Sequence, residues 1–368
     1  MEIGFIGLPQ AGKKTLLRLL TGVNAEAVAP TNRGTVPGVC AVRDPRIERL
    51  TTMYRPKKTT PATIQYLLMP DLTKDSAKNQ ELLKALALVD VLGLVVRAFA
   101  DDTVFHLEGS VDPLRDITTA EAELLLNDLL FVEKRLERIA KEQNRRSSVD
   151  RSKEQMVLTK LQTHLNESLP LRTLTLDPEE EKLLSGAPLL TRKPLLIILN
   201  VGEAQVRAVD LLQEVKQRSA QHRVHTVQVS AKIEQELSQL DDPAERAAFL
   251  KELGIAESAI DGLTRTSYEA LGLISYFTVG EDEVRAWTVP RGATAAQAGG
   301  VIHSDIERGF IRAELTKYDD LITLGSEQAV AGAGKAMLKG REYIVEDGDI
   351  LNFRFSVAPS NTQGSRKV

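Results

Sequence analysis

The strongest constraint on the fold of this 368-residue chain is a short glycine-containing loop near its start. Residues 2–7 form an apolar run that ends in glycine, and an apolar-periodic stretch, TLLRLLTG, begins at Thr15. Residues 7–15 read G-L-P-Q-A-G-K-K-T, which nearly matches the phosphate-binding pattern G-x-x-x-x-G-K-[ST]. In a strand, loop and helix of this order, backbone N–H groups point inward and cradle phosphate. The sequence therefore predicts a nucleotide-binding loop.

Most positions of this loop have an expected role. Gly7 and Gly12 allow a tight backbone path, and Lys13 would reach the β and γ phosphates. The next position normally carries the hydroxyl that binds Mg²⁺, but Lys14 stands there, and its ammonium group would repel the metal and partly neutralise a phosphate. Alternatively, Lys14 extends into solvent and the loop only retains its ancestral shape. The predicted phosphate-binding residues are Gly7, Pro9, Gln10, Ala11, Gly12, Lys13, Lys14 and Thr15.

Apolar runs like the first one recur along the chain and predict the fold class. They cover residues 62–69, 89–99 and 194–201, and helical patterns separate several of them. Continuous rather than alternating apolar runs are typical of parallel strands that are covered on both faces. The expected fold is a doubly wound α/β domain with a mainly parallel sheet.

Two further regions have different patterns. Leu125, Leu129, Val132, Leu136 and Ile139 repeat at spacings of 4, 3, 4 and 3, and Leu158, Leu161 and Leu165 share a face after a polar stretch. This predicts an antiparallel helical hairpin, or alternatively two ordinary surface helices. From about residue 275, short strands with one helix between them predict a small α+β domain. The predicted domains are 1–114 with 186–274, the hairpin 115–185, the C-terminal domain 275–358 and a flexible tail 359–368.

Composition limits the partners and the cellular location that we expect for the chain. The net charge of −4 argues against broad nucleic-acid binding, and we expect no DNA partner. Apolar runs fall short of the ~18–20 residues of a membrane span, and no secretion signal is seen. The lone Cys40 excludes an intrachain disulfide framework, so we expect a cytoplasmic protein. Two local basic clusters would suit phosphate backbones or form solvated faces: Arg55, Lys57 and Lys58, and Arg145, Arg146 and Arg151.

Several motifs resemble one known family. Asn200-Val201-Gly202-Glu203 resembles the NxxE motif that the YchF family carries where most GTPases have NKxD, and residues 229–241 resemble the loop that contacts the base. The YchF family consists of Obg-like P-loop ATPases of the TRAFAC class. Residues 283–315 and 334–355 are very similar to its C-terminal TGS domain, a β-grasp module. The resemblance covers nearly the whole chain.

The resemblance implies nucleotide binding, with ATP preferred over GTP because of the glutamate in NxxE. Asn200, Val201, Glu203, Ser230 and Ala231 are then expected at the base. It also implies association with a ribosome or structured RNA.

His106 falls where YchF proteins carry a mobile-loop histidine implicated in hydrolysis. A single histidine after an apolar strand is otherwise more often a capping or surface residue.

The chain departs from the family in its switch regions. Leu68 stands where the switch II aspartate is expected, and Asp71 could serve the metal only if the register slips by three. Thr31 and Thr35 are both candidates for the switch I threonine. Because the lost groups serve Mg²⁺ and the γ-phosphate, the presence of Mg²⁺ is in doubt, and hydrolysis is expected to be weak or absent. Two functions remain: a slow ATPase or GTPase that acts as a switch on the ribosome, or a pseudo-NTPase scaffold.

Overall fold

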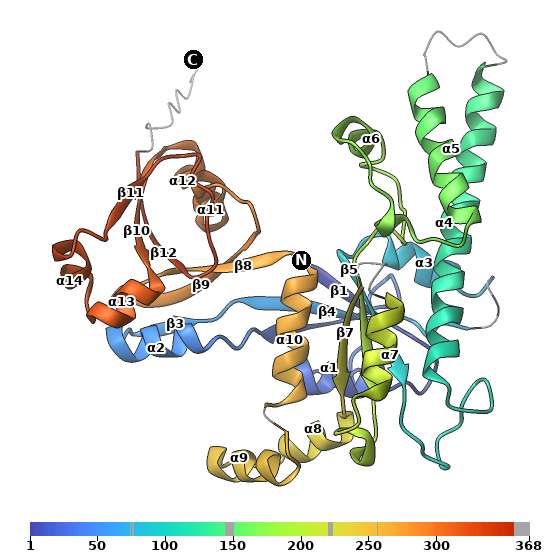
Figure 1. Cartoon of the computed structure of the whole chain (residues 1–368), viewed down its shortest axis with the longest axis horizontal. Helices are drawn as coiled ribbons and strands as arrows, with labels where there is room; N and C mark the ends of the chain where they lie inside the picture. Colours follow the sequence, from blue (N-terminus) through green and yellow to red (C-terminus); the bar gives the residue numbers. More distant parts are fainter. Residues whose placement is uncertain (74, 76, 144–150, 220–223, 256, 357–368) are drawn as a thin grey trace, which may run out of the picture. The chain divides into compact units, whose positions relative to one another are not determined.

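The computed structural model describes the chain except residues 74, 76, 144–150, 220–223, 256 and 357–368. The chain folds into two compact units (Figure 1). The first contains residues 1–40 and 64–271, and the second contains residues 41–63 and 272–368. The predicted tail and the cations Arg145 and Arg146 lie outside the described residues. None of the described helices combines the length and apolar character needed to cross a membrane.

A six-stranded sheet forms the centre of the first unit, in the order β2-β4-β1-β5-β6-β7 (Figure 1). The neighbours from β4 to β7 all run parallel. Every residue of β5 and β6 is buried, and because successive side chains point to opposite faces, both faces must be covered. The predicted doubly wound, mainly parallel fold is confirmed. The strands are β1 (Glu2–Ile6), β2 (Val36–Ala41), β4 (Thr63–Leu68), β5 (Val91–Arg97), β6 (Leu195–Asn200) and β7 (Val224–Val229).

Helices pack on this sheet and extend from it. Helix α4 contacts β5, α7 contacts β7, and α10 contacts both β6 and β7. The helices of the first unit are α1 (Lys13–Thr21), α3 (Gln80–Leu86), α4 (Pro113–Gln143), α5 (Ser152–Asn166), α6 (Pro178–Leu183), α7 (Asp210–Ser219), α8 (Ala231–Leu237), α9 (Pro243–Glu252) and α10 (Ala259–Ala270), with short 3-10 turns η1 (Leu171–Thr173) and η2 (Glu203–Gln205).

The second unit has a mixed sheet in the order β11-β10-β12-β8-β9-β3. Strands β8 and β9 form an antiparallel hairpin, and the last strand, β12, lies between β8 and β10, parallel to β8. With a helix after the first hairpin, this is the β-grasp arrangement that was expected. Its elements are α2 (Pro45–Tyr54), β3 (Lys58–Thr60), β8 (Leu273–Thr278), β9 (Glu283–Pro290), α11 (Ala295–Ile302), α12 (Ser304–Arg308), β10 (Phe310–Lys317), α13 (Tyr318–Leu324), α14 (Glu327–Gly332), β11 (Met337–Lys339) and β12 (Asp349–Phe355).

Residues 41–63 belong to the second unit, whereas the sequence-based boundaries place them in the nucleotide-binding domain. The reason is a parallel pairing of β3 with β9 that local sequence does not reveal. Arg46 of α2 adds a second attachment, because its guanidinium pairs with Asp347 at 2.8 Å and lies over the ring of Phe277. Asp347 in turn accepts a hydrogen bond from the Ser275 backbone.

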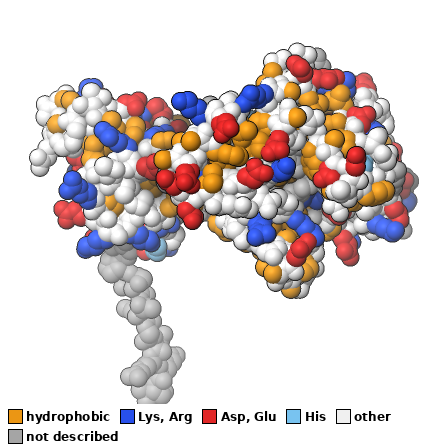
Figure 2. Space-filling model, turned by 90° about the horizontal axis from the view of Figure 1, so that it is seen from below, with side chains coloured by type: hydrophobic (Ala, Val, Ile, Leu, Met, Phe, Trp, Pro, Cys, Tyr) orange, Lys and Arg blue, Asp and Glu red, His pale blue; other side chains and the backbone are white. Residues whose placement is uncertain are grey.

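The predicted basic clusters are largely paired with acids in the described part of the chain. Lys57 pairs with Asp282 at 2.8 Å, and Lys58 pairs with Glu283 at 3.3 Å. Arg151 likewise contacts two glutamates on α4 and α5. Figure 2 shows Lys and Arg side chains interspersed with Asp and Glu side chains over the face that it displays. These cations therefore do not form an open positive patch by themselves.

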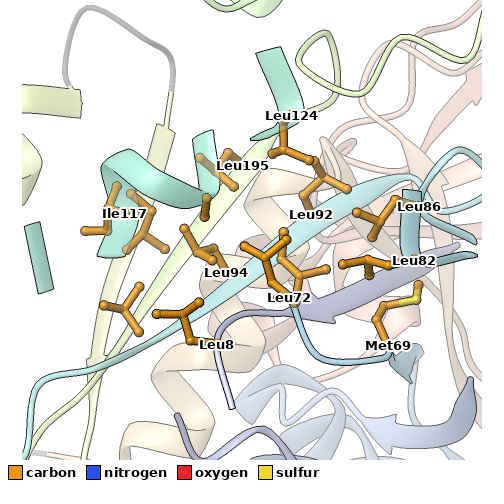
Figure 3. Close-up of a cluster of buried hydrophobic side chains, with 14 of the residues drawn as sticks. Leu8, Met69, Leu72, Leu82, Leu86, Leu92, Leu94, Ile117, Leu124 and Leu195 are labelled. Carbon is orange, nitrogen blue, oxygen red and sulfur yellow. The ribbon is translucent and has the colours of Figure 1, made fainter. Parts of the chain in front are cut away.

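One apolar core of the first unit packs between the sheet and helices α3 and α4. Leu92 and Leu94 of β5 meet Leu82 and Ile117 of these helices, and Leu8 from the predicted phosphate loop joins the same cluster (Figure 3). The loop is thereby attached to the core by an apolar side chain as well as by its backbone.

The helical insertion is present, with α5 packed along α4 (Figure 1). Every residue of the two predicted apolar seams belongs to one cluster. Val132 and Ile139 of α4 are fully buried in it, as is Leu161 of α5. The heptad spacing thus identified the face on which the two helices meet.

A buried carboxylate attaches the root of the insertion to the chain that leads into β6. Asp128 of α4 accepts hydrogen bonds from the backbone N–H groups of Leu190 and Thr191 at 2.8 and 2.7 Å, and from the Thr191 hydroxyl at 2.7 Å. Burial raises the pKa of Asp128, although each of these hydrogen bonds lowers it. Arg172 of η1 forms an ion pair with Glu121, which lies on α4 like Asp128.

We expect Asp128→Ala to lower the free energy of unfolding by about 2–4 kcal/mol, because it leaves two buried backbone donors without an acceptor. Urea denaturation of the full chain, followed by circular dichroism, measures this. Glu137→Ala removes an exposed acid from the same helix and is expected to change stability by less than about 0.5 kcal/mol. Equal stability of the two variants would show that Asp128 does not anchor the insertion.

Candidate nucleotide-binding site

The loop between β1 and α1 follows a path that only glycine fits at two places. Gly7 has a φ of 146°, and a Cβ there would lie 2.3 Å from the carbonyl oxygen of Val95. Gly12 has a φ of 98°, and its Cβ would lie 2.2 Å from Nδ2 of Asn200. Such approaches are far inside van der Waals contact, and both backbone conformations are rare for other residues. The two motif glycines are therefore required by the shape of the loop.

Lys13 is the most buried cation of the loop, with 5 % of its side chain exposed. Its Nζ donates to the carbonyl oxygens of Gly7 and Leu8 at 2.8 and 2.6 Å, and pairs with Oδ1 of Asp71 at 2.7 Å. Burial lowers the pKa of Lys13, and the charge of Asp71 opposes that effect. The ammonium group is held at the mouth of the loop, where phosphate oxygens would replace these acceptors.

Asn200, at the end of β6, joins the loop to the segment after β7. Its Nδ2 donates to the carbonyl oxygen of Ala11 at 3.0 Å, and its Oδ1 accepts from the backbone N–H of Ala231 at 3.1 Å. Ser230 caps α8 through the backbone N–H of Ile233. The structure thus brings the predicted phosphate residues together with Asn200, Ser230 and Ala231, which are far apart in the sequence.

The other two residues predicted near the base lie beside Asn200. Val201 is buried, and Glu203 is half exposed in η2. The Glu203 carboxylate pairs with Nζ of Lys232 at 3.1 Å. The glutamate of the NxxE-like motif, Glu203, therefore already has a cationic partner.

Lys14 points away from the centre of the loop. Its side chain is 65 % exposed, and its Nζ lies 3.4 Å from a carboxylate oxygen of the exposed Glu26. The next residue, Thr15, is half buried in the first turn of α1. Pro9 and Gln10, which were also predicted to bind phosphate, form the turn at the start of the loop, and Gln10 has a positive φ of 62°.

The region expected to hold Mg²⁺ does not form an oxygen cage. Leu68 is a buried apolar residue at the end of β4, and the carboxylate of Asp71 is occupied by Lys13. The hydroxyls of Thr31 and Thr35 lie 2.8 Å apart and bond to each other. Across the part of the chain that the structure describes, no three His, Cys, Asp or Glu side chains cluster in a way that could hold a metal ion.

Asn79 fixes the segment that replaces a glycine-rich switch. It is fully buried, and its Oδ1 accepts from the backbone N–H and the hydroxyl of Thr73 at 3.0 and 3.1 Å. Its Nδ2 donates to the Thr73 carbonyl and to Glu123 of α4. The chain just after Asp71 is therefore pinned by one amide to the main body of the unit.

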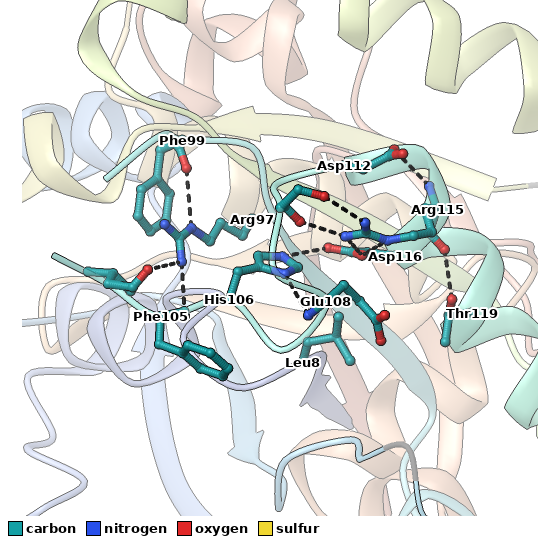
Figure 4. A network of polar contacts seen from close by, with 12 residues as sticks. Leu8, Arg97, Phe99, Phe105, His106, Glu108, Asp112, Arg115, Asp116 and Thr119 are labelled. Atoms are coloured by element: carbon teal, nitrogen blue, oxygen red, sulfur yellow. Dashed lines mark hydrogen bonds and ion pairs between the residues drawn. The ribbon is translucent and has the colours of Figure 1, made fainter. Parts of the chain in front are cut away.

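His106 lies close to the loop, buried at the start of a polar network (Figure 4). Its Nδ1 accepts from the backbone N–H of Glu108 at 3.1 Å, so that in the neutral ring the proton is on Nε2, which lies 3.0 Å from Oδ2 of Asp116. The ring lines a small cavity with Leu8, Pro9 and Ala11 of the loop. Both ring nitrogens are thus engaged by the protein.

Arg97 organises the segment that carries His106. Its buried guanidinium, at the end of β5, donates to four backbone carbonyls of this segment, those of Phe99, Asp101, Val104 and Phe105. Figure 4 shows Arg97 beside Phe99 and Phe105. It also lies 4.7 Å from the centre of the Phe99 ring. Sequence reasoning missed Arg97, although a charged residue at the end of an otherwise apolar strand was a usable signal. Asp116 and Asn79 carried no such signal, because only tertiary contacts give them partners.

Comparisons of this chain with known proteins all point to the same family. A family model named YchF-GTPase_C, described as "Protein of unknown function (DUF933)", matches residues 273–356. The ribosome-binding ATPase YchF of Bacillus subtilis (strain 168) is 39 % identical and covers 97 % of this chain and 100 % of its own length. The protein of the same name from Escherichia coli O157:H7 is 37 % identical, with 97 % and 99 % covered.

Solved structures agree with this result. The Schizosaccharomyces pombe YchF GTPase superposes with a TM-score of 0.81 at 31 % identity, and covers 96 % of this chain and 97 % of its own. A GTP-binding protein from Pyrococcus horikoshii OT3 has a TM-score of 0.59 at 19 % identity, with 97 % and 100 % covered, which shows a shared fold.

We expect Asn200→Ala to lower the free energy of unfolding by about 1–3 kcal/mol, because the Ala11 carbonyl and the Ala231 N–H both lose their buried partner. Thermal and urea unfolding of the full chain measure this loss. Gln235→Ala, which removes an exposed amide from α8, is the matched control and is expected to be neutral. If Asn200→Ala is equally neutral, Asn200 does not hold the two segments together.

Proposed function

The chain belongs to the YchF family, and we propose that it is a nucleotide-binding member that accepts ATP in preference to GTP. It would act as a switch on the ribosome, with slow or no hydrolysis. The observation that carries this proposal is the convergence on one loop of a buried lysine ammonium, Lys13, and the amide of Asn200. The lysine offers charge to phosphates, and the amide ties the phosphate loop to the segment expected at the base.

The preference for ATP is supported by the pairing of Glu203. Guanine recognition needs a carboxylate that is free to accept from two N–H groups of the base. One carboxylate oxygen of Glu203 lies 3.1 Å from Nζ of Lys232, so guanine would have to compete with that cation for the carboxylate. Adenine makes no such demand. Val201, Ser230 and Ala231 are the other residues that we expect beside the base.

Slow or absent turnover is supported by the state of His106 and of the switch residues. Both nitrogens of His106 are engaged, so it would act on water only after its segment releases Asp116. Leu68 provides no carboxylate, and a metal role for Asp71 would require it to leave Lys13. If turnover is lost entirely, the chain is a pseudo-NTPase scaffold in which nucleotide only stabilises the fold.

Association with ribosomes is proposed from family membership. The relatives from Bacillus subtilis and Escherichia coli are named ribosome-binding ATPases. The basic clusters that the sequence suggested give little added support, since Lys57 and Lys58 are paired with acids. A cytoplasmic location follows from such a partner.

Titration calorimetry of the nucleotide-free chain with ATP and with GTP tests the nucleotide proposal. We expect ATP to bind more tightly, and Lys13→Met to weaken binding at least about tenfold, because it removes the charge at the phosphates. Lys134→Met, which changes an exposed lysine of α4, is expected to leave affinity unchanged. Tighter binding of GTP, or unchanged binding by Lys13→Met, would contradict the proposal.

Co-sedimentation with ribosomal subunits tests the partner. We expect the chain to pellet with ribosomes at about 50 mM salt and to be released as salt rises, because contacts with RNA phosphates release counterions. Centrifugation of the chain without ribosomes controls for aggregation. Absence from every ribosomal fraction at low salt would contradict the proposed association with ribosomes.

A further inference from the structure

The phosphate loop places a lysine where this fold normally binds a metal ion through a hydroxyl. We infer that this chain binds nucleoside triphosphate without Mg²⁺, and that the ammonium of Lys14 takes over the charge-neutralising role of the metal. The inference deepens the proposed function and rests on it, since it concerns how the same site holds the same ligand.

The described residues around the loop do not fit Mg²⁺. The ion takes six oxygen ligands in near-octahedral geometry, from waters, from the phosphates of the nucleotide and from one or two protein carboxylates or hydroxyls. A lysine ammonium has three donors and no lone pair, so Lys14 cannot be a ligand. Turned towards the phosphates, its positive charge would also repel a divalent cation bound there.

The other expected ligands are committed elsewhere. Leu68 has no donor atom, and Asp71 forms an ion pair with Lys13 at 2.7 Å. Thr31 and Thr35 bond to each other through their hydroxyls, in a turn that is also closed by a 2.8 Å backbone hydrogen bond between them. A triphosphate that displaces Asp71 from Lys13 would free this one carboxylate. It would restore neither the hydroxyl missing at position 14 nor the carboxylate missing at position 68.

Lys14 would reach phosphate by turning from Glu26 towards the loop. It lies in the first turn of α1, directly after Lys13, where the N-terminal end of the nine-residue helix favours negative charge. Its contact with Glu26 is 3.4 Å long between two exposed side chains, and such pairs contribute little free energy. The side chain can leave Glu26 at low cost and donate to the triphosphate.

Two carboxylates contact the lysines of the loop and must separate from them before the lysines can bind a triphosphate. Glu26 lies against Lys14, and Asp71 lies against Lys13. A triphosphate offers each ammonium more negative charge and more acceptors than a single carboxylate does, so exchange of partners is favourable. Lys14 would supply one of the two positive charges that Mg²⁺ carries. It would not organise an attacking water, which fits the slow or absent hydrolysis proposed above.

Calorimetric titration of the full, nucleotide-free chain with ATP tests the inference, once in excess Mg²⁺ and once in EDTA. We expect the two dissociation constants to agree within about threefold. In EDTA, Lys14→Ser is expected to weaken binding at least about tenfold, while Lys14→Arg, which keeps the charge, retains most of the affinity.

Arg18→Ser is the matched control, because it removes one exposed positive charge from the same helix one turn further along. It is expected to change affinity by less than about twofold. Thermal unfolding of each variant verifies that the exposed substitutions leave the fold intact.

The outcomes separate the inference from the function on which it rests. Binding by the unmodified chain only in Mg²⁺, or equal affinity of Lys14→Ser and the unmodified chain in EDTA, overturns the metal-free mode and leaves nucleotide binding standing. Failure of ATP and GTP to bind under either condition overturns the proposed function and the inference together.

Discussion

The structure around the site depends on one buried positive charge. An ammonium group out of water is costly unless acceptors surround it, and Lys13 obtains three: two carbonyls of its own loop and the carboxylate of Asp71. The loop that supplies the carbonyls also packs against Val95 and Asn200 so closely that only glycine fits at positions 7 and 12. The contact of Lys13 with Asp71 draws the chain after β4 against the loop. Strand β1, helix α1 and the segment after β4 therefore meet at a single cation.

Helix α4 connects this site with the inserted hairpin. Its first turn carries Asp116, which holds His106 beside the phosphate loop. Glu123 bonds to Asn79 about two turns further on, and Asp128 then fixes the chain that leads into β6. Beyond Asp128 the helix continues into the apolar seam with α5. A single helix thus has polar attachments near the candidate phosphate loop at one end and the hairpin at the other.

The sequence predicted the features that depend on neighbouring residues and missed those that depend on residues far apart in the chain. The parallel sheet, the hairpin seams and the β-rich C-terminal unit are recorded in local periodicity, and all appear in the structure. The assignment of residues 41–63 to the second unit was not predicted, because β3 is three residues long and gains its identity from pairing with β9 more than two hundred residues away. The basic clusters were visible, but their acidic partners were not, so Lys57 and Lys58 looked more available than they are.

By itself the sequence determined the phosphate-loop motif, the family resemblance and the unusual residues at positions 14 and 68. Each of these depends only on which residue type stands at a given position of a motif. Only the tertiary structure decided what those side chains contact. It paired Asp71 with Lys13, turned Lys14 towards Glu26 and engaged both nitrogens of His106. Such choices depend on distances between segments that fold together from far apart, and on the free energy of burying a charge. A motif carries neither of these quantities.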